Sequence, residues 1–255
     1  MQIAPGIYTV GRRAGRKAYL GGYSRAYLLD DEDTGLTLID TLSDADARPI
    51  LEQIDRLGKS VRDLERILLT HAHRSHLMGL SRLKILSGAT VYAHEWEAGV
   101  VAGERKAQPV PLGPASPTSL LTMRLGLALG AKHPPCRVDE YLTDGKKVGP
   151  VTTIHTPGHT PGHCVFYWPE QRALFTGDNV ATWPQFSAGW PNFQLDDSQF
   201  RASMLRMAET VREMTPDRPP VIVLGVSHGD PITRGASKRL SALLDEASAD
   251  RAAPQ

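Results

Sequence analysis

The alternation of apolar and polar positions predicts a series of short buried strands. Residues 26–29 and 36–39 are apolar runs, and the polar, turn-forming stretch 30–35 separates them. Runs of this length that end in turn-forming residues are typical of strands in a packed core. The predicted strands cover residues 26–29, 36–39, 67–69, 90–93, 151–155, 164–168, 173–176 and 221–224.

Apolar residues at helical spacing predict helices between these strands. In residues 47–57 the apolar positions recur every three to four residues, and the same spacing begins at Leu77 and continues to Ile85. A further helix is predicted over 199–214, and a polar helix ends the chain. The pattern therefore alternates between strands and helices without one long β-α-β series.

The middle of the chain is predicted to form a loop and a short helix. Residues 100–117 contain several prolines and glycines and show no period, which is typical of a loop. Residues 120–129 are apolar enough for a short helix. The segment 100–135 could cover a site as a lid, or it could pack as an ordinary surface helix, and both interpretations remain open.

The alternation of strands and helices without a linker favours one globular α/β domain over residues 1–255, with a motif-bearing core at about 20–235, although length alone would also allow two domains. Hydrophobic residues make up 41% and charged residues 22% of the chain, values that are ordinary for a folded protein. We find no linker and no internal repeat. A chain of 255 residues can bury a core without disulfides or a structural metal. A metal site in this chain would therefore be functional rather than a staple of the fold.

Charge and cysteine usage exclude several classes of function. The net charge is +1, and no dense block of Lys or Arg indicates a nucleic-acid surface. Cys136 and Cys164 form no CxxC pair, so we expect two free thiols in a reducing compartment. The first residues lack the apolar region of a signal peptide, and no apolar run is long enough for a membrane span. A cytoplasmic location is therefore expected.

The densest chemical signal lies in residues 70–76, directly after a predicted strand. They read Thr-His-Ala-His-Arg-Ser-His, so three of the nine histidines fall within six residues. His71 and His73, two positions apart on an extended backbone, point to the same side. Zinc takes such neutral imidazole nitrogens at about 2.0–2.1 Å. His76 begins the next helix and can face the same cavity, so the segment predicts part of a metal site.

Three later strand ends also present metal-ligating side chains. His159 lies in the glycine-flanked turn Thr-Pro-Gly-His-Thr-Pro-Gly, Asp178 ends Phe-Thr-Gly-Asp, and His228 lies in Ser-His-Gly-Asp. Each is weak alone, since a single histidine in a loop is more often solvated. Together the four strand ends are the arrangement that a convergent metal site requires. The other histidines match no ligand position: His94, His133, His155 and His163.

The order of these motifs resembles the metallo-β-lactamase superfamily. HxHxxH, TPGHT, GD and SHG follow one another, and the likeness runs from about residue 27 to residue 230, with Leu-Ile-Asp-Thr at 38–41 included. The resemblance implies an αβ/βα four-layer sandwich of two facing mixed β-sheets with outer helices. It places the site at the rim between the sheets, and it is specific for the superfamily but not for the substrate.

The resemblance also implies a binuclear site, with zinc as the expected metal and iron as an alternative. Two ions about 3.5–4 Å apart can share a water whose pKa falls towards neutrality, which yields a hydroxide to attack a carbonyl. The implied ligands are His71, His73 and His159 for the first ion, His76 and His228 for the second, and Asp178 as the bridge.

One position departs from the family motif, HxHxDH. Ser75 stands where an aspartate normally ligates the second ion and orients the attacking water. We interpret Ser75 as a cap of the following helix, a role that Ser and Asp fill about equally well, with loss of one ligand and a weakened second site. A serine bound to metal is the alternative. Asp178 and Ser75 are the predicted catalytic positions, and Asp40 is expected to orient the histidine loop by hydrogen bonds. The four histidines outside the ligand positions are expected to be structural or solvent-facing, and His163, near His159, is the one candidate among them for support of a ligand.

The loop after Asp178 contains four aromatic residues and no Lys or Arg before Arg201. Aromatic walls favour an apolar substrate, although the same residues could equally pack the loop onto the domain. The 27 residues after His228 are too few for the helical glutathione-binding domain of glyoxalase II-like enzymes. We therefore predict hydrolysis of a lactone, ester, thioester or amide. The predicted substrate-binding residues are Trp183, Phe186, Trp190 and Phe193.

Two other functions remain open. His71, His159 and Asp178 match the 2-His-1-carboxylate set of the superfamily's persulfide dioxygenases, which bind one iron. A degenerate metal-binding protein without catalysis is the second alternative, and the retention of five ligand histidines and Asp178 argues against it. The expected partner is a small-molecule substrate, with no nucleic acid and no membrane, and a homodimer is left open.

Overall fold

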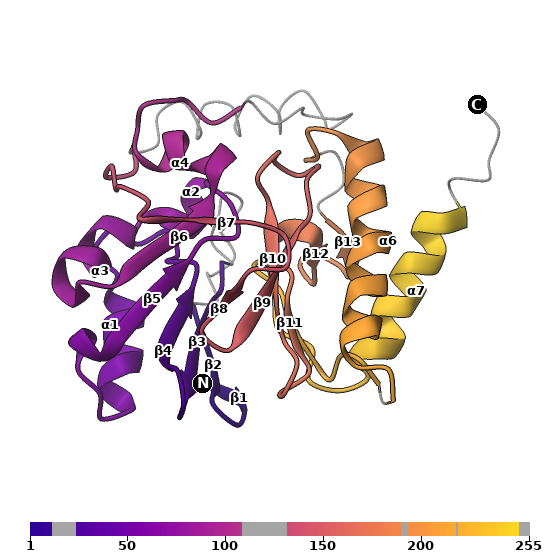
Figure 1. Ribbon diagram of the computed structural model, residues 1–255, viewed down its shortest axis with the longest axis horizontal. Helices are drawn as coiled ribbons and strands as arrows, with labels where there is room; N and C mark the ends of the chain where they lie inside the picture. Colours follow the sequence, from indigo (N-terminus) through magenta and orange to yellow (C-terminus); the bar gives the residue numbers. More distant parts are fainter. Residues whose placement is uncertain (12–23, 109–131, 190–192, 218, 250–255) are drawn as a thin grey trace.

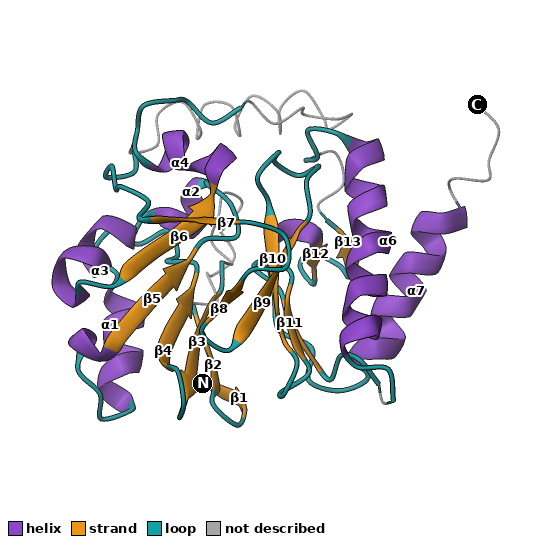
Figure 2. Cartoon of the chain, viewed as in Figure 1, coloured by secondary structure: helices purple, strands orange, loops and turns teal. Residues whose placement is uncertain are grey.

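The computed structural model describes residues 1–11, 24–108, 132–189, 193–217 and 219–249. Two β-sheets lie face to face in the centre, and helices cover both outer faces (Figure 1). Figure 2 shows the same layers by type of secondary structure. This is the predicted αβ/βα four-layer sandwich of two mixed sheets, and the predicted fold class is confirmed. The predicted helix at 120–129 and most of the predicted lid segment lie outside the described residues.

The first sheet has seven strands in the order β1-β2-β3-β4-β5-β6-β7. Its first four strands pair antiparallel, whereas β4 to β7 run parallel to one another. The strands are β1 (Gln2–Ala4), β2 (Ile7–Val10), β3 (Ala26–Asp31), β4 (Gly35–Ile39), β5 (Leu64–Leu68), β6 (Thr90–His94) and β7 (Glu140–Leu142).

The second sheet has five strands in the order β14-β11-β10-β9-β8, with one parallel pair, β11 with β14. A separate two-stranded ribbon, β12 with β13, follows β11 in the chain. The strands are β8 (Lys147–Val148), β9 (Val151–His155), β10 (Cys164–Trp168), β11 (Ala173–Phe175), β12 (Val180–Ala181), β13 (Ser187–Ala188) and β14 (Val223–Gly225).

The two-residue period of the strands divides the core into three layers. In β3, Leu29 faces the other sheet, whereas Leu28 faces the helices outside the first sheet. In β10, Phe166 faces inward, and Val165 and Tyr167 face the helices outside the second sheet. Both sheets are therefore buried on both faces, which explains why their strands read as continuous apolar runs.

Helices α1, α3 and α4 pack on the first sheet, and α6 and α7 pack on the second (Figure 1). Within the described residues, no helix is both long enough and apolar enough to cross a bilayer. The helices are α1 (Arg48–Arg56), α2 (Arg74–Leu77), α3 (Leu80–Ser87), α4 (Glu95–Val101), α6 (Asp197–Met214) and α7 (Ala236–Ala249).

The helix predicted from Leu77 to Ile85 is two helices, α2 and α3, because the chain is interrupted at Gly79. At this glycine the backbone passes so close to the preceding loop that a Cβ would lie 2.8 Å from the carbonyl oxygen of Thr41. Ile85, although it fits the apolar period, is 76% exposed. Close packing of two backbones, rather than the local period, sets the helix boundary here.

Two other predicted boundaries were wrong. The segment 100–117 was predicted as a loop, but its first residues, Val100 and Val101, are buried at the end of α4. The helix was missed because its seven residues are too few to show a clear apolar period. The last strand was predicted at 221–224, whereas β14 covers Val223–Gly225.

Candidate metal centre

The predicted ligands meet at one rim of the sandwich, in the loops that follow β5, β9, β11 and β14. His71 and His73 follow β5, and His159 follows β9. Asp178 lies in the single turn of 3₁₀ helix after β11, and His228 follows β14. The first two strands of this set belong to different sheets, so the centre lies where the two sheets meet.

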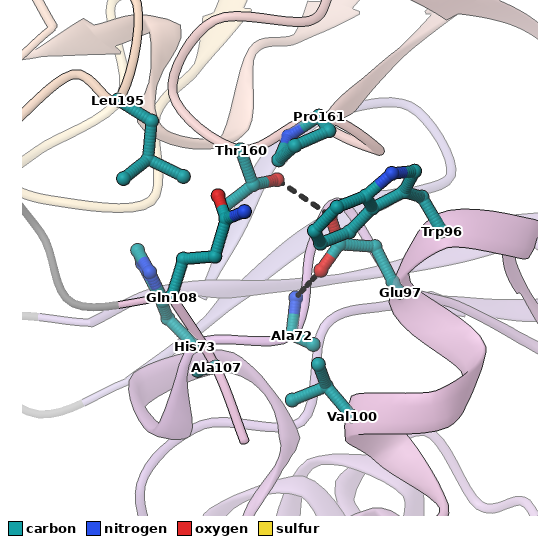
Figure 3. Close-up of a pocket in the computed structure, with 10 residues that line it drawn as sticks. All are labelled: Ala72, His73, Trp96, Glu97, Val100, Ala107, Gln108, Thr160, Pro161 and Leu195. Carbon is teal, nitrogen blue, oxygen red and sulfur yellow. Dashed lines mark hydrogen bonds between the residues drawn. The ribbon is translucent and has the colours of Figure 1, made fainter. Parts of the chain in front are cut away.

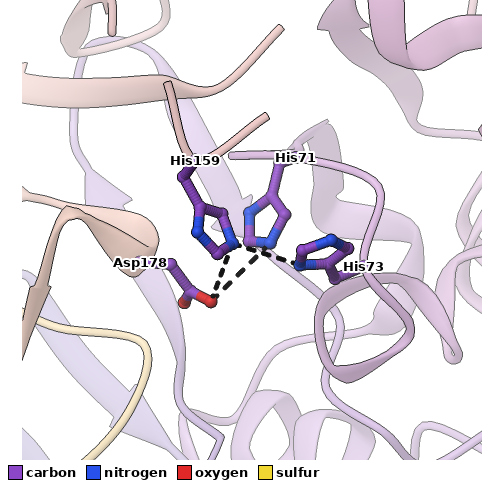
Figure 4. Close-up of side chains that lie close together, drawn as sticks. All are labelled: His71, His73, His159 and Asp178. Atoms are coloured by element: carbon purple, nitrogen blue, oxygen red, sulfur yellow. Dashed lines mark hydrogen bonds and ion pairs between the residues drawn. The ribbon is translucent and has the colours of Figure 1, made fainter. Parts of the chain in front are cut away.

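One group of side chains contains His71, His73, His159 and Asp178, whose ligand atoms all lie within 4.8 Å of one another (Figure 4). His159 Nε2 lies 3.1 Å from His73 Nδ1 and 3.3 Å from Asp178 Oδ2. His71 Nε2 lies 3.8 Å from the same carboxylate oxygen. Three imidazole nitrogens and one oxygen thus converge on one point, and we call these residues the first group.

The second group contains His76, His228 and again Asp178. His76 Nε2 lies 3.4 Å and His228 Nε2 3.3 Å from Asp178 Oδ1. The two oxygens of Asp178 therefore face different groups of histidines. This is the geometry that a carboxylate bridging two ions requires.

Buried atoms without hydrogen bonds test whether a cation fits this centre. His71 Nε2, His76 Nε2 and Asp178 Oδ1 are buried and make no hydrogen bond to any residue that the structure describes. A buried polar atom without a partner costs about 1–3 kcal/mol. A divalent cation would satisfy all three, and imidazole nitrogens with a carboxylate oxygen are the ligands that zinc takes. The residues therefore fit a metal ion.

The electrostatics of the two groups differ. Burial lowers the pKa of His71 well below its usual value and, with the neighbouring His159, lowers the pKa of His73 to about 3. Burial acts in the same direction on His76, but the carboxylates of Asp178 and Asp40 outweigh it and raise its pKa to about 10. Burial thus lowers the pKa values of two histidines in the first group, whereas two neighbouring carboxylates raise the pKa of His76 in the second.

Asp178 remains ionised between these histidines. Burial alone would raise its pKa, but His228 and His76 hold the pKa of this carboxyl well below its usual range. The carboxylate is therefore ready to bind a cation without losing a proton.

Asp40 makes the hydrogen bonds predicted for it. The backbone N–H of Thr70 donates to Asp40 Oδ1 at 2.9 Å, and the Thr70 hydroxyl donates to Oδ2 at 2.8 Å. His76 Nδ1 lies 2.8 Å from the same Oδ2. A proton on Nδ1 therefore points to Asp40, which leaves Nε2 directed into the centre.

His163, the one candidate for a supporting role among the remaining histidines, contacts the backbone of Asp178. The backbone N–H of Asp178 donates to His163 Nε2 at 3.2 Å, so the proton of this imidazole is on Nδ1, 2.8 Å from the Thr156 hydroxyl. Gly177 has φ +54°, and a Cβ there would lie 2.5 Å from His163 Nε2. The glycine of the Gly-Asp motif is therefore required by this close approach.

The interpretation of Ser75 as a helix cap was wrong. Helix α2 begins at Arg74, its N-cap is His73, and no side chain caps it. Ser75 is the second residue of the helix and is half-buried. The helix starts two residues earlier than a cap at Ser75 would require, because the chain turns directly after His73. Ser75 therefore lies within the first turn.

The structure separates the aromatic residues predicted to bind substrate. Trp183 lines a cavity of about 450 Å³ together with Gly229 and Asp230, the two residues that follow His228. Phe186 packs against the apolar layer between the second sheet and its helices. Phe193 is half-buried, and Trp190 lies outside the described residues. Of the three that the structure describes, Trp183 is the one that lines this cavity.

Sequence reasoning missed two polar side chains that contact the ligand loops. Gln194 Oε1 lies 3.2 Å from His159 Nδ1, which directs the other nitrogen of that ring into the first group. Glu97 accepts hydrogen bonds from the loops of His73 and His159. Neither residue belongs to a motif, and a single Glu in a helix carries no signal of its contacts.

Comparison with known proteins agrees with this geometry. The chain is 27% identical over 229 residues to the uncharacterized protein YobT of Bacillus subtilis (strain 168), covering 87% of this chain and 89% of that protein. It is 31% identical over 155 residues to a hydroxyacylglutathione hydrolase of Cereibacter sphaeroides (strain ATCC 17023), covering 61% of this chain. The match spans only 47%, about half, of that relative's length.

Solved structures show the same fold. The metallo-beta-lactamase family protein TTHA1429 from Thermus thermophilus superposes with a TM-score of 0.64 at 24% identity, over 97% of this chain and 81% of that one. The model of the metallo-beta-lactamase superfamily matches residues 19–226, most of the chain. The chain therefore belongs to the metallo-β-lactamase superfamily.

Proposed function

We propose that the protein is a metal-dependent hydrolase that cleaves a lactone, ester, thioester or amide bond in a small, mainly apolar molecule. The observation that carries the proposal is the carboxylate of Asp178, which faces histidine nitrogens on both sides at 3.3–3.8 Å. Membership of the superfamily and the similarity to hydroxyacylglutathione hydrolases support a hydrolase.

Some residues of the centre would bind the metal ions, and others orient these ligands. Divalent ions bound there would lower the pKa of a water molecule and polarise the substrate carbonyl. Asp178 supplies one oxygen to each group, and Asp40 directs His76 Nε2 towards it. Gln194 does the same for His159. These contacts hold the ligands in place before a substrate arrives.

Zinc is the metal we propose, with two ions and the second held more weakly. The first group offers three imidazoles and one carboxylate oxygen, a complete tetrahedral set. The second group offers two imidazoles and the other oxygen of Asp178, and Ser75 adds no negative charge. An ion there keeps fewer protein ligands.

One observation favours a second candidate function. His71 Nε2 and His159 Nε2 lie 3.8 and 3.3 Å from Asp178 Oδ2, so two histidines and one carboxylate already converge on one face. This is the ligand set of mononuclear iron oxygenases, and it supports the persulfide dioxygenase alternative. The cytoplasmic location and the homodimer stay predictions.

Metal content and activity, measured on the same preparation, test both functions. Protein purified without added metal is analysed for zinc and iron, then assayed with lactones, esters and thioesters and, separately, for oxygen uptake with a persulfide. Zinc with hydrolysis supports the proposal, and one iron per chain with oxygen uptake supports the alternative. Metal without either activity would indicate a degenerate protein. Asp178→Asn, which keeps the shape but not the charge, is the matched control.

A further inference from the structure

Glu97 is a buried carboxylate that contacts two ligand loops without being a ligand. It lies on α4 and is 3% exposed. Its Oε2 accepts a hydrogen bond from the backbone N–H of Ala72 at 3.0 Å. Its Oε1 accepts from the Thr160 hydroxyl at 2.6 Å and from the backbone N–H of Gly162 at 3.0 Å. Figure 3 shows the carboxylate between Ala72 and Thr160.

These contacts join neighbours of two metal-ligating histidines. Ala72 precedes His73 in the loop after β5, and Thr160 follows His159 in the loop after β9. The two loops leave different sheets, yet His159 Nε2 and His73 Nδ1 lie only 3.1 Å apart. The relative position of these two nitrogens decides whether they can bind the same ion.

We propose that Glu97 is a positioning residue that holds His73 and His159 at the spacing needed to bind one metal ion. The proposal rests on metal binding at the first group, as in the proposed function. One carboxylate oxygen holds each loop, so a shift of one loop relative to the other breaks a charged hydrogen bond. Hydrogen bonds of this kind are about twice as strong as neutral ones.

The shape of the second loop supports a dedicated contact. At Gly162 a Cβ would lie 2.8 Å from Glu97 Oε1, so any larger residue would push the carboxylate away. The second glycine of Thr-Pro-Gly-His-Thr-Pro-Gly is therefore explained by the approach of Glu97, not by a turn alone. Docking of α4 does not need the charge, since Val100 and Val101 of the same helix are already buried in the core.

The Glu97→Gln variant shows whether the negative charge of the side chain matters or only its size and shape. All three partners of Glu97 donate hydrogen bonds to it. An amide has one oxygen and one NH₂ group, so in Glu97→Gln a donor would face the N–H of either Ala72 or Gly162. In either orientation one backbone N–H would lose its acceptor, whereas the Thr160 hydroxyl can turn to accept from the amide. Alanine would release both loops.

The test is a zinc titration in competition with a chromophoric chelator, in a His228→Ala background that leaves only the first group complete. Residues that orient metal ligands typically contribute 10–100-fold to metal affinity. We expect Glu97→Ala to weaken zinc binding by about 10–100-fold and Glu97→Gln to weaken it by less. Glu95→Gln is the matched control, because Glu95 lies on the same helix but is exposed. It should bind zinc as the background does.

A second variant tests the same contact from the other side. Gly162→Ala leaves Glu97 unchanged but displaces its carboxylate, and it should also weaken zinc binding. If either Glu97 variant alters the fold, Gly162→Ala gives the answer instead. The melting temperature of each metal-free variant shows how much of the effect is structural.

Unchanged zinc affinity in folded Glu97→Ala and Gly162→Ala would overturn the proposal. So would a fall in the metal-free melting temperature without a change in zinc affinity, because that result would assign Glu97 to the docking of α4. The titration uses zinc alone, so it does not depend on hydrolysis. A protein whose zinc affinity depends on Glu97 but which hydrolyses nothing would refute the proposed function and support this inference.

Discussion

The two groups of the metal centre share Asp178 but differ in the number of their histidines and in the direction in which the histidine pKa values are shifted. The first group has three histidines, and the pKa values of His71 and His73 are lowered. The second has two histidines, and the pKa of His76 is raised to about 10. A shared carboxylate therefore does not make two equal sites, since the remaining ligands and their protons set the affinity of each.

The position of Ser75 increases this difference. It lies next to His76 in the chain, so the charge missing from the family motif is missing beside the second group. The first group keeps every residue of its set, and Glu97 connects two of its loops. We therefore expect tight binding of one ion and weak binding of the other.

Asp178 belongs to both groups, and its replacement should have the largest effect. Asp178→Ala is expected to lower kcat/KM for the best lactone or ester by at least about 100-fold, or roughly 2.7 kcal/mol. Both ions should be lost or weakened, because each group loses its anionic ligand. Activity close to that of the unaltered protein would contradict a shared carboxylate.

Removal of a single histidine should show which of the two ions each group binds. His71→Ala or His159→Ala is expected to remove most of the tightly bound metal, whereas His228→Ala should remove only the ion that dialysis also removes. Metal content measured before dialysis shows the loss of either ion, and metal content measured after dialysis shows the loss of the tightly bound one. Unchanged metal in the His71 and His159 variants would disprove the first group as a site, and equal losses in all three would disprove the difference between the groups.

Ser75→Asp restores the charge of the family motif and should reduce the difference in metal affinity between the two groups. We expect tighter binding of the second ion and, in a hydrolase of the usual type, higher activity, since the added carboxylate attracts the cation. Ser81→Asp is the matched control, because Ser81 holds the same second position in α3.

Metal titrations of the unaltered protein and of Ser75→Asp, with rates, give the answer. Equal affinity of both sites in the unaltered protein would show that the charge argument is wrong. Impaired turnover in the aspartate variant would mean that Ser75 is adapted to this protein's own reaction.

The smallest expected effect is a change in the pH dependence of stability, and it concerns α4, the helix that carries Glu97. His94 Nδ1 accepts a hydrogen bond from the N–H of Trp96 at the start of α4. Burial and the nearby His155 lower the pKa of His94 from 6.5 to about 4. As the pH falls, His94 is protonated in the unfolded protein before it is protonated in the folded protein, which favours unfolding. The stability that neutral His94 contributes is therefore lost as the pH falls from about 6.5 towards 4.

His94→Asn keeps a side chain suited to the cap but removes the titration. Between pH 7 and pH 5, the melting temperature of the variant should fall less than that of the unaltered protein. Metal-free samples are compared, so that protons and metal do not compete. An identical pH dependence of both proteins would exclude His94 as a source of acid sensitivity near the first group.

The family, and the meeting of five histidines and Asp178 at one place, could be predicted from the sequence, because these side chains lie in short, ordered motifs after strands. His71 and His73 are two residues apart, and the strand before them appears as an apolar run. The cap assigned to Ser75 was wrong, because α2 begins two residues earlier than that assignment requires and no local pattern fixes this start. The aromatic loop left two interpretations, and only packing showed that Phe186 faces the helices of the second sheet while Trp183 lines a cavity.

The sequence by itself determined which side chains can bind metal and the strands that present them, because a strand's period and a motif's spacing are local properties. The tertiary structure alone decided which nitrogens share each oxygen of Asp178, and what holds them there. The partners of Glu97 are 25, 63 and 65 residues away along the chain. Contacts over such separations arise when sheets and helices pack, and no local pattern of residues records them.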